Sequence, residues 1–100
     1  MSKPKILIRY CPKCNWLLRS AWMTQELLYT FSEDLQSVTL EPSCEAGMFE
    51  IRYNDDLLWE RKRDGGFPDV KALKQRVRDR LDPDRDLGHL DRKQDDGQGG

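Results

Sequence analysis

Two of the three cysteines stand close together near the start of the chain, in Cys11-Pro12-Lys13-Cys14. Cysteines separated by two residues occur in dithiol redox centres and in metal sites. Sulfurs one helical turn apart can also form and break a disulfide with little backbone movement. The spacing therefore predicts a Cys11–Cys14 disulfide, a share in a metal site, or two partly buried structural cysteines.

The position of the pair between two elements favours the redox interpretation. Residues 5–10 are a short apolar run typical of a buried strand, and a helical periodicity follows the pair. A Cys-x-x-Cys at the strand–helix junction of a strand–helix–strand unit is the context of redox motifs. A closed zinc site needs four ligands, and outside the pair only Cys44 and His89 are candidates. We therefore predict no metal site.

Cys11 is expected to be the more readily ionised thiol. Pro12 suits the first position of a helix, because its missing N–H would be unpaired there, and Cys11 then becomes the N-cap. Its sulfur would face the free N–H groups and the positive dipole end of the helix, which favour the thiolate. Lys13 adds a cation nearby.

Hydrophobic periodicity predicts the elements that position the pair. The apolar strand Lys5–Tyr10 is expected to be covered on both faces. A helix over residues 15–31 is expected to bury a single stripe, and residues 37–41 alternate as a strand that Pro42 ends. The expected buried stripe of the helix consists of Leu17, Leu18, Ala21, Trp22, Leu28 and Phe31.

The second half of the chain predicts a hairpin and a second helix. After a loop over residues 42–47, residues 48–53 alternate as a strand, and residues 57–62 return antiparallel to it until Gly65-Gly66. Asp69 is expected to cap a helix that Pro83 stops, with Val70, Leu73, Val77 and Leu81 on its apolar face. The order predicts an α+β fold with a four-stranded mixed sheet and two helices, because a strand–helix–strand crossover joins parallel neighbours.

Charge and hydropathy exclude several classes of partner. The 100 residues include 17 Lys or Arg and 18 Asp or Glu, a net charge of −1. We therefore expect neither nucleic acid nor a membrane as a partner, and we interpret the basic run Arg61-Lys62-Arg63 as solvated surface. The sequence shows no apolar run long enough for a membrane span and no signal peptide, so we expect a cytoplasmic location.

The C-terminal residues differ in composition from the rest. Residues 84–100 contain only Leu87 and Leu90 as large apolar residues, too few to offset the entropy of ordering them. We predict one domain over residues 1–83 and a charged, flexible tail over residues 84–100. The oligomeric state is left open.

Cys44 and the tryptophans allow more than one role. Cys44 could approach the pair, hold glutathione as a mixed disulfide, or be a surface thiol, and the last is favoured because no cation stands beside it in the sequence. Trp16 could flank the cysteines in an apolar patch. Trp22 and Trp59 are expected in the core.

Three segments resemble the selenoprotein W-related (Rdx) family, here with cysteine at both positions of the pair. They are Ile-Arg-Tyr-Cys-Pro-Lys-Cys at residues 8–14, Gly-Met-Phe-Glu-Ile at 47–51 and Gly-Gly-Phe-Pro-Asp at 65–69. Their order and spacing extend the resemblance over about residues 5–82. It implies a thioredoxin-like fold, thiol redox chemistry without a bound cofactor, and glutathione as a partner or co-substrate. It also implies that Phe67 helps wall the site with Pro12, Lys13 and Trp16.

The resemblance also bears on which of the two cysteines attacks the substrate first. In selenocysteine-containing relatives selenium occupies the position of Cys14, whereas the helix-terminus argument favours Cys11. We predict that Cys11 attacks and Cys14 resolves, in a thiol–disulfide redox protein acting on glutathione or protein thiols. The alternative is a non-catalytic protein-binding module in which the pair is a redox switch. A loop replaces the helix usual before the third strand, so Pro42 is not assigned the role of the thioredoxin cis-proline.

Overall fold

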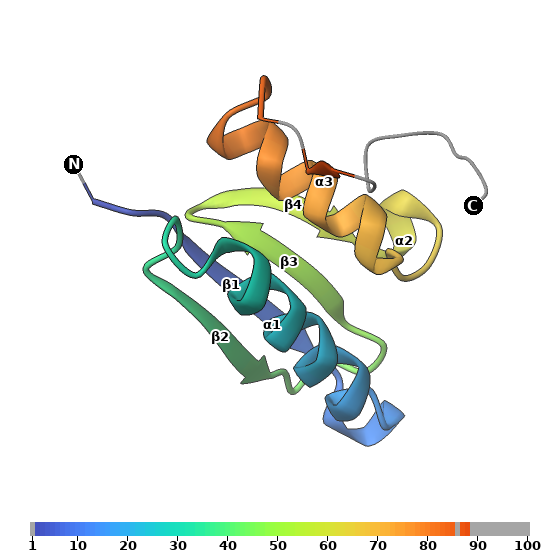
Figure 1. Cartoon of the computed structure of the whole chain (residues 1–100). Coiled ribbons are helices and arrows are strands. Elements are labelled where there is room, and N and C mark those ends of the chain that lie inside the picture. Colours follow the sequence, from blue (N-terminus) through green and yellow to red (C-terminus); the bar gives the residue numbers. More distant parts are fainter. Residues whose placement is uncertain (1, 86, 89–100) are drawn as a thin grey trace.

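The computed structural model describes residues 2–85, 87 and 88 and places eight elements along them (Figure 1). In chain order these are β1 (Lys5–Tyr10), the 3-10 turn η1 (Pro12–Cys14), α1 (Leu17–Phe31), β2 (Ser37–Pro42), β3 (Phe49–Tyr53), β4 (Asp56–Glu60), α2 (Arg61–Asp64) and α3 (Val70–Leu81). No helix among the described residues is long and apolar enough to cross a membrane.

The four strands form one mixed sheet in the order β2-β1-β3-β4. β1 pairs in parallel with β2 and antiparallel with β3, and β3 pairs antiparallel with β4. The helices α1 and α3 pack on the same face of this sheet (Figure 1). The structure thus confirms the α+β prediction of a four-stranded mixed sheet with two main helices, compatible with a thioredoxin-like fold.

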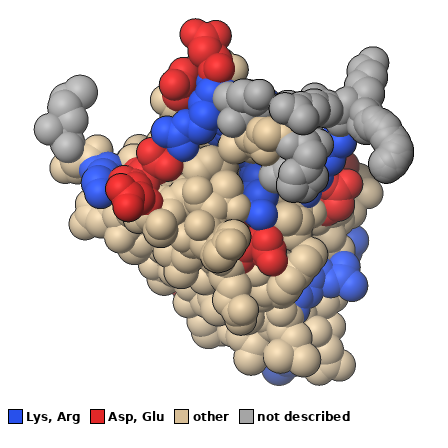
Figure 2. Space-filling view, in the orientation of Figure 1, with Lys and Arg blue, Asp and Glu red and all other residues tan. Residues whose placement is uncertain are grey.

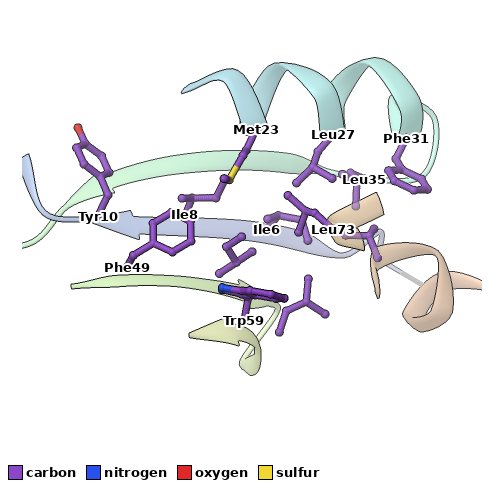
Figure 3. Packing of buried hydrophobic residues seen from close by; sticks show 13 residues of the cluster. Ile6, Ile8, Tyr10, Met23, Leu27, Phe31, Leu35, Phe49, Trp59 and Leu73 are labelled. Atoms are coloured by element: carbon purple, nitrogen blue, oxygen red, sulfur yellow. The ribbon is translucent and has the colours of Figure 1, made fainter. Parts of the chain in front are cut away.

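The core lies between the sheet and the two helices (Figure 3). Ile6 and Ile8 of β1 point into it, while Leu7 and Arg9 lie on the other face and are only partly buried. That second face carries ion pairs from Arg9 to Glu41 and Glu50. The expectation that this strand would be covered on both faces is therefore wrong, because both main helices pack on one side of the sheet.

The buried side of α1 differs from the predicted stripe. Of the predicted residues only Phe31 is fully buried, whereas Leu18 is 82% exposed and Trp22 is 50% exposed. The helix bears apolar residues around most of its circumference, so periodicity alone could not select the face that packs on the sheet. The residues that α1 buries are Ser20, Met23, Leu27 and Phe31.

The strand predicted over residues 57–62 ends earlier, at Glu60. The Glu60 side chain accepts a hydrogen bond from the Arg63 N–H at 2.7 Å, and Asp64 accepts one from the Glu60 N–H at 2.9 Å. This reciprocal capping supports one helical turn, which Gly65 ends in a left-handed conformation. The Asp69 cap of α3 is confirmed, because its carboxylate accepts from the Ala72 N–H at 2.7 Å.

The described chain continues past α3 and returns to the end of α1. Two nitrogens of the Arg85 guanidinium lie 2.8 and 2.9 Å from the two Asp34 carboxylate oxygens. Leu87 packs against the core. The structured part therefore includes some residues beyond Pro83. The rest of the predicted tail, with His89, lies outside the described residues and stays a prediction.

Candidate functional site

Cys11 and Cys14 lie together where β1 ends. Cys11 directly follows the strand, and Cys14 is the last residue of η1. The Cys14 thiol donates a hydrogen bond to the Cys11 sulfur at 2.6 Å, and both residues are free cysteines. Cys11 is only 2% exposed, whereas Cys14 is partly exposed. The two sulfurs are thus close together as free thiols, and the predicted disulfide between them stays a prediction.

The predicted position of Cys11 at the cap of the long helix is wrong. Cys11 precedes the three-residue turn η1, and Asn15 then takes a left-handed conformation at φ 61°. The helix α1 starts only at Leu17, with Trp16 as its N-cap. Pro12 does occupy the first position, as expected, but of a 3-10 turn too short for the macrodipole on which the prediction relied.

Hydrogen bonds lower the pKa of Cys11, although the long helix does not start there. The largest effect comes from the Cys14 S–H, followed by the Gly47 backbone N–H. The backbone N–H groups of Lys13 and Cys14 in η1 lower it too, as predicted for free N–H groups beside the cap. The same S–H···S hydrogen bond raises the pKa of Cys14, because it holds the proton on Cys14. At intermediate pH the arrangement favours a Cys11 thiolate beside a protonated Cys14.

Gly47 reaches the pair because the loop between β2 and β3 is fixed to the end of β1. Tyr10 and Pro42 are paired in the parallel register, and the Ser43 N–H donates to the Tyr10 carbonyl oxygen at 2.8 Å. Gly47 has φ 75°, a conformation that side chains disfavour. The sequence indicated Gly47 as the end of a loop and as part of the segment that resembles the family, but nothing local indicates that its N–H reaches a distant sulfur. No peptide bond in the described part is cis, that of Pro42 included.

A cavity of about 510 Å³ opens beside Cys11, between η1 and the loop from β2 to β3. It brings three of the predicted site residues to Cys11, namely Pro12, Lys13 and Cys44. Lys13 thus provides a cation at the cavity that Cys44 borders, which the sequence order did not indicate. The full lining is Cys11, Pro12, Lys13, Pro42, Ser43, Cys44 and Ala46.

Trp16 and Phe67 form an aromatic pair apart from this cavity. Their ring centroids are 4.9 Å apart in an edge-to-face contact, and Phe67 packs in turn on Phe49 at 4.7 Å. Neither ring borders the cavity beside Cys11. The predicted wall residues therefore fall into two groups, with Pro12 and Lys13 at the cavity of Cys11 and the two aromatic rings packed on each other away from it.

Arg61 belongs to this second group, although the sequence indicated solvated surface. Its guanidinium carbon lies 5.1 Å from the centre of the Trp16 ring, and the residue is partly buried. Its positive charge acts to lower the pKa of Cys14, against the larger effect of the hydrogen bond to Cys11. The other two tryptophans differ in burial: Trp59 is in the core, as predicted, whereas Trp22 is half exposed.

The metal interpretation finds no support within the described residues. Over residues 2–85, 87 and 88 no three His, Cys, Asp or Glu side chains are grouped so that they could hold a metal ion. His89, the fourth ligand candidate, lies outside this part of the chain.

The part of the chain that carries these elements and the cysteine pair matches a known protein family. The family model of the Rdx family matches residues 5–79, which run from the first strand almost to the end of α3. The chain belongs to the Rdx family. A comparison with curated proteins gave no match.

Two solved structures are similar to this Rdx chain along most of its length. A Bordetella parapertussis protein is 57% identical over 80% of this chain and all of its own, with a TM-score of 0.78. A selenoprotein W-related protein from Vibrio cholerae is also 57% identical, over 81% of this chain and all of its own, again with a TM-score of 0.78. The resemblance to the selenoprotein W-related family is thereby confirmed. It suggests a redox role for the neighbouring thiols of Cys11 and Cys14.

Proposed function

We propose that this Rdx protein is a thiol–disulfide oxidoreductase whose catalytic residues are Cys11 and Cys14. The observation that carries the proposal is the separation of only 2.6 Å between the two free sulfur atoms. Their interaction lowers the pKa of Cys11 and raises that of Cys14, which favours Cys11 as the thiolate and Cys14 as its proton donor. A nucleophilic thiolate beside a second thiol is what disulfide exchange needs.

The reduction of a substrate disulfide would take two exchange steps. The Cys11 thiolate attacks one substrate sulfur, the substrate S–S bond breaks, and the departing thiolate takes up a proton. Cys14 then loses its proton and attacks the Cys11 sulfur, which releases the second substrate thiol and leaves a Cys11–Cys14 disulfide. Two molecules of a thiol reductant such as glutathione reduce that disulfide and become one glutathione disulfide, so two electrons pass in each half-cycle.

Each neighbouring group has a part in these steps. The Gly47 N–H supports the Cys11 thiolate in the first step, and Lys13 puts a positive charge at the cavity where an anionic thiol would enter. Arg61 favours the thiolate of Cys14, which the second step requires. A nucleophilic thiol should be both acidic and accessible. Cys11 is the more acidic of the two cysteines, whereas Cys14 is the more exposed. We assign the attack to Cys11, since it is the more acidic thiol and also lines a cavity that a substrate can enter.

The cavity beside Cys11 suits a small thiol or an extended segment of a protein. Its volume of about 510 Å³ falls within the range of pockets that hold small ligands. We propose glutathione or protein thiols as the partners, and a cytoplasmic location, where a reducing thiol pool would return the pair to its dithiol form.

The experiment combines mass spectrometry and turnover in a Cys44→Ser background, in which only the pair can form an internal disulfide. Mild oxidation should remove two hydrogens, and adding Cys11→Ser or Cys14→Ser should abolish that loss. The same protein should reduce hydroxyethyl disulfide with glutathione as the reductant. If oxidation leaves both thiols open to alkylation, the proposal fails.

A second candidate function rests on the outer surface of α1. Leu18 and Tyr29 are more than four-fifths exposed and Trp22 is half exposed, and Figure 2 shows a broad face with few charged side chains in this region. A protein-binding module whose pair acts as a redox switch would use such a face. Formation of the disulfide without any turnover would favour this function over the oxidoreductase.

A further inference from the structure

The cavity beside Cys11 has a second cysteine on its wall. Cys11 and Cys44 both line it, whereas Cys14 does not. Cys44 belongs to the loop between β2 and β3 and is exposed, so it is open to reagents in a way that buried Cys11 is not. Cys11 therefore contacts the thiol of Cys14 and shares a cavity with Cys44.

The backbone holds the loop that carries Cys44 against the end of β1. Cys11 follows Tyr10 and Cys44 follows Ser43, and the Ser43 N–H donates to the Tyr10 carbonyl oxygen at 2.8 Å. The parallel register pairs Tyr10 with Pro42, so Cys44 lies one residue beyond the position opposite Cys11. The two cysteines therefore border one cavity from two segments of the chain.

We propose that Cys44 is a second resolving thiol for Cys11. The inference rests on the proposed function, since it assumes that Cys11 forms mixed disulfides. It gives Cys11 two alternative internal partners, Cys44 on the wall of the cavity and Cys14 outside it, with Lys13 as the cation of the cavity.

The chemistry balances without another reactant. In a mixed disulfide of Cys11 with a substrate thiol, the Cys44 thiolate attacks the Cys11 sulfur, the bond to the substrate sulfur breaks, and the substrate leaves as a thiolate. The proton given up by Cys44 goes to that departing thiolate through solvent. The product is a Cys11–Cys44 disulfide with Cys14 still reduced, and glutathione reduces it as it would the Cys11–Cys14 disulfide.

Two observations favour Cys44 over an inert surface thiol. The hydrogen bond to Cys11 raises the pKa of Cys14, so the first resolving thiol is hindered in losing its proton. Cys44 makes no such bond to Cys11 among the described contacts and stands on the cavity that a substrate would enter. A cation lies at that cavity too, which removes the reason for interpreting Cys44 as an isolated thiol.

The test uses Cys14→Ser, in which Cys44 is the only internal partner left for Cys11. After treatment with glutathione disulfide, this variant should lose two hydrogens, and peptide mapping without reductant should recover a peptide that links Cys11 to Cys44. Its glutathione adduct should decay, whereas the double variant C14S/C44S should keep the adduct on Cys11, at a level at least several-fold higher. Cys14→Ala repeats the measurement with a different replacement.

The control is Glu45→Gln in the Cys14→Ser protein, a change in the same loop but off the cavity wall, which should leave the Cys11–Cys44 link intact. A stable adduct in Cys14→Ser and in Cys14→Ala, with no linked peptide, would overturn the role of Cys44. The proposed function would stand in that case, provided that the Cys11–Cys14 disulfide still forms in the Cys44→Ser background.

Discussion

The thiol of Cys14 donates its proton to the sulfur of Cys11, and this one hydrogen bond shifts the two pKa values in opposite directions. Two residues of the same type therefore acquire different chemistry. The difference comes mainly from the direction of this bond, because the Gly47 N–H acts to lower the pKa of both thiols.

Removing the Cys14 donor should make Cys11 less acidic. In Cys14→Ala the pKa of Cys11 should rise toward its ordinary value, because its thiolate loses the largest stabilising contact. Alkylation of Cys11 by iodoacetamide at neutral pH should slow several-fold, since only the thiolate reacts. The rate is measured against pH by mass spectrometry of the Cys11 peptide. An unchanged midpoint in that profile would contradict the assigned cause.

Gly47→Ala should damage the site through the backbone alone. A Cβ at Gly47 would meet nothing within 4 Å, but φ 75° is strained for alanine and costs about 1–2 kcal/mol. Relief of that strain would move the N–H away from the Cys11 sulfur and slow its alkylation. Gly65→Ala is the matched control, with φ 81° and equally open space. It should lose similar stability in urea unfolding while Cys11 keeps its reactivity.

Arg61→Gln should slow the resolving step. Without the guanidinium charge the pKa of Cys14 rises further, so less Cys14 thiolate is present to attack a mixed disulfide. In the Cys44→Ser background the glutathione adduct of Cys11 should persist several-fold longer at neutral pH, as followed by mass spectrometry after rapid acid quenching. The adjacent Lys62→Gln, at an exposed position, serves as the control. Equal lifetimes in the two variants would exclude this role of Arg61.

The ion pair between Asp34 and Arg85 should make stability depend on pH at the acidic end. The hydrogen bonds from Arg85 hold the pKa of Asp34 below its ordinary value, so the carboxylate is stabilised in the folded state. That contribution is complete above the unfolded pKa of about 3.9 and is lost as the pH falls through the lower folded value. Because both side chains are partly exposed, Arg85→Gln should cost about 0.5–1 kcal/mol at pH 7. Urea unfolding should show the difference from the unchanged protein vanishing in strong acid.

The sequence predicted the parts of this protein that depend on local patterns. The strand Lys5–Tyr10 has the expected bounds, and the helix after Asp69 begins at its expected cap. Local rules suffice there, because a strand pattern and a capping carboxylate act within a few residues.

Features that depend on tertiary contacts were not predicted. The buried face of α1 was assigned wrongly because Ser20 lies inside and Leu18 outside, against their hydropathy. The strand after the hairpin turn was extended too far because Glu60 and Asp64 cap a helical turn together. The cysteine pair itself was found, but its electrostatic neighbours Gly47 and Arg61 come from distant segments that no spacing rule connects to it.

The fixing of the β2–β3 loop to β1 has a consequence for the newly made chain. Gly47 meets Cys11 only after β2 has paired with β1, and α1 must first complete the crossover between those strands. Until then the Cys11 sulfur has only the contacts of its own turn, from Lys13 and Cys14. The full acidity of Cys11 therefore develops only as the sheet forms. The reactivity of the Cys11 thiol at neutral pH is thus also a measure of how far the chain has folded.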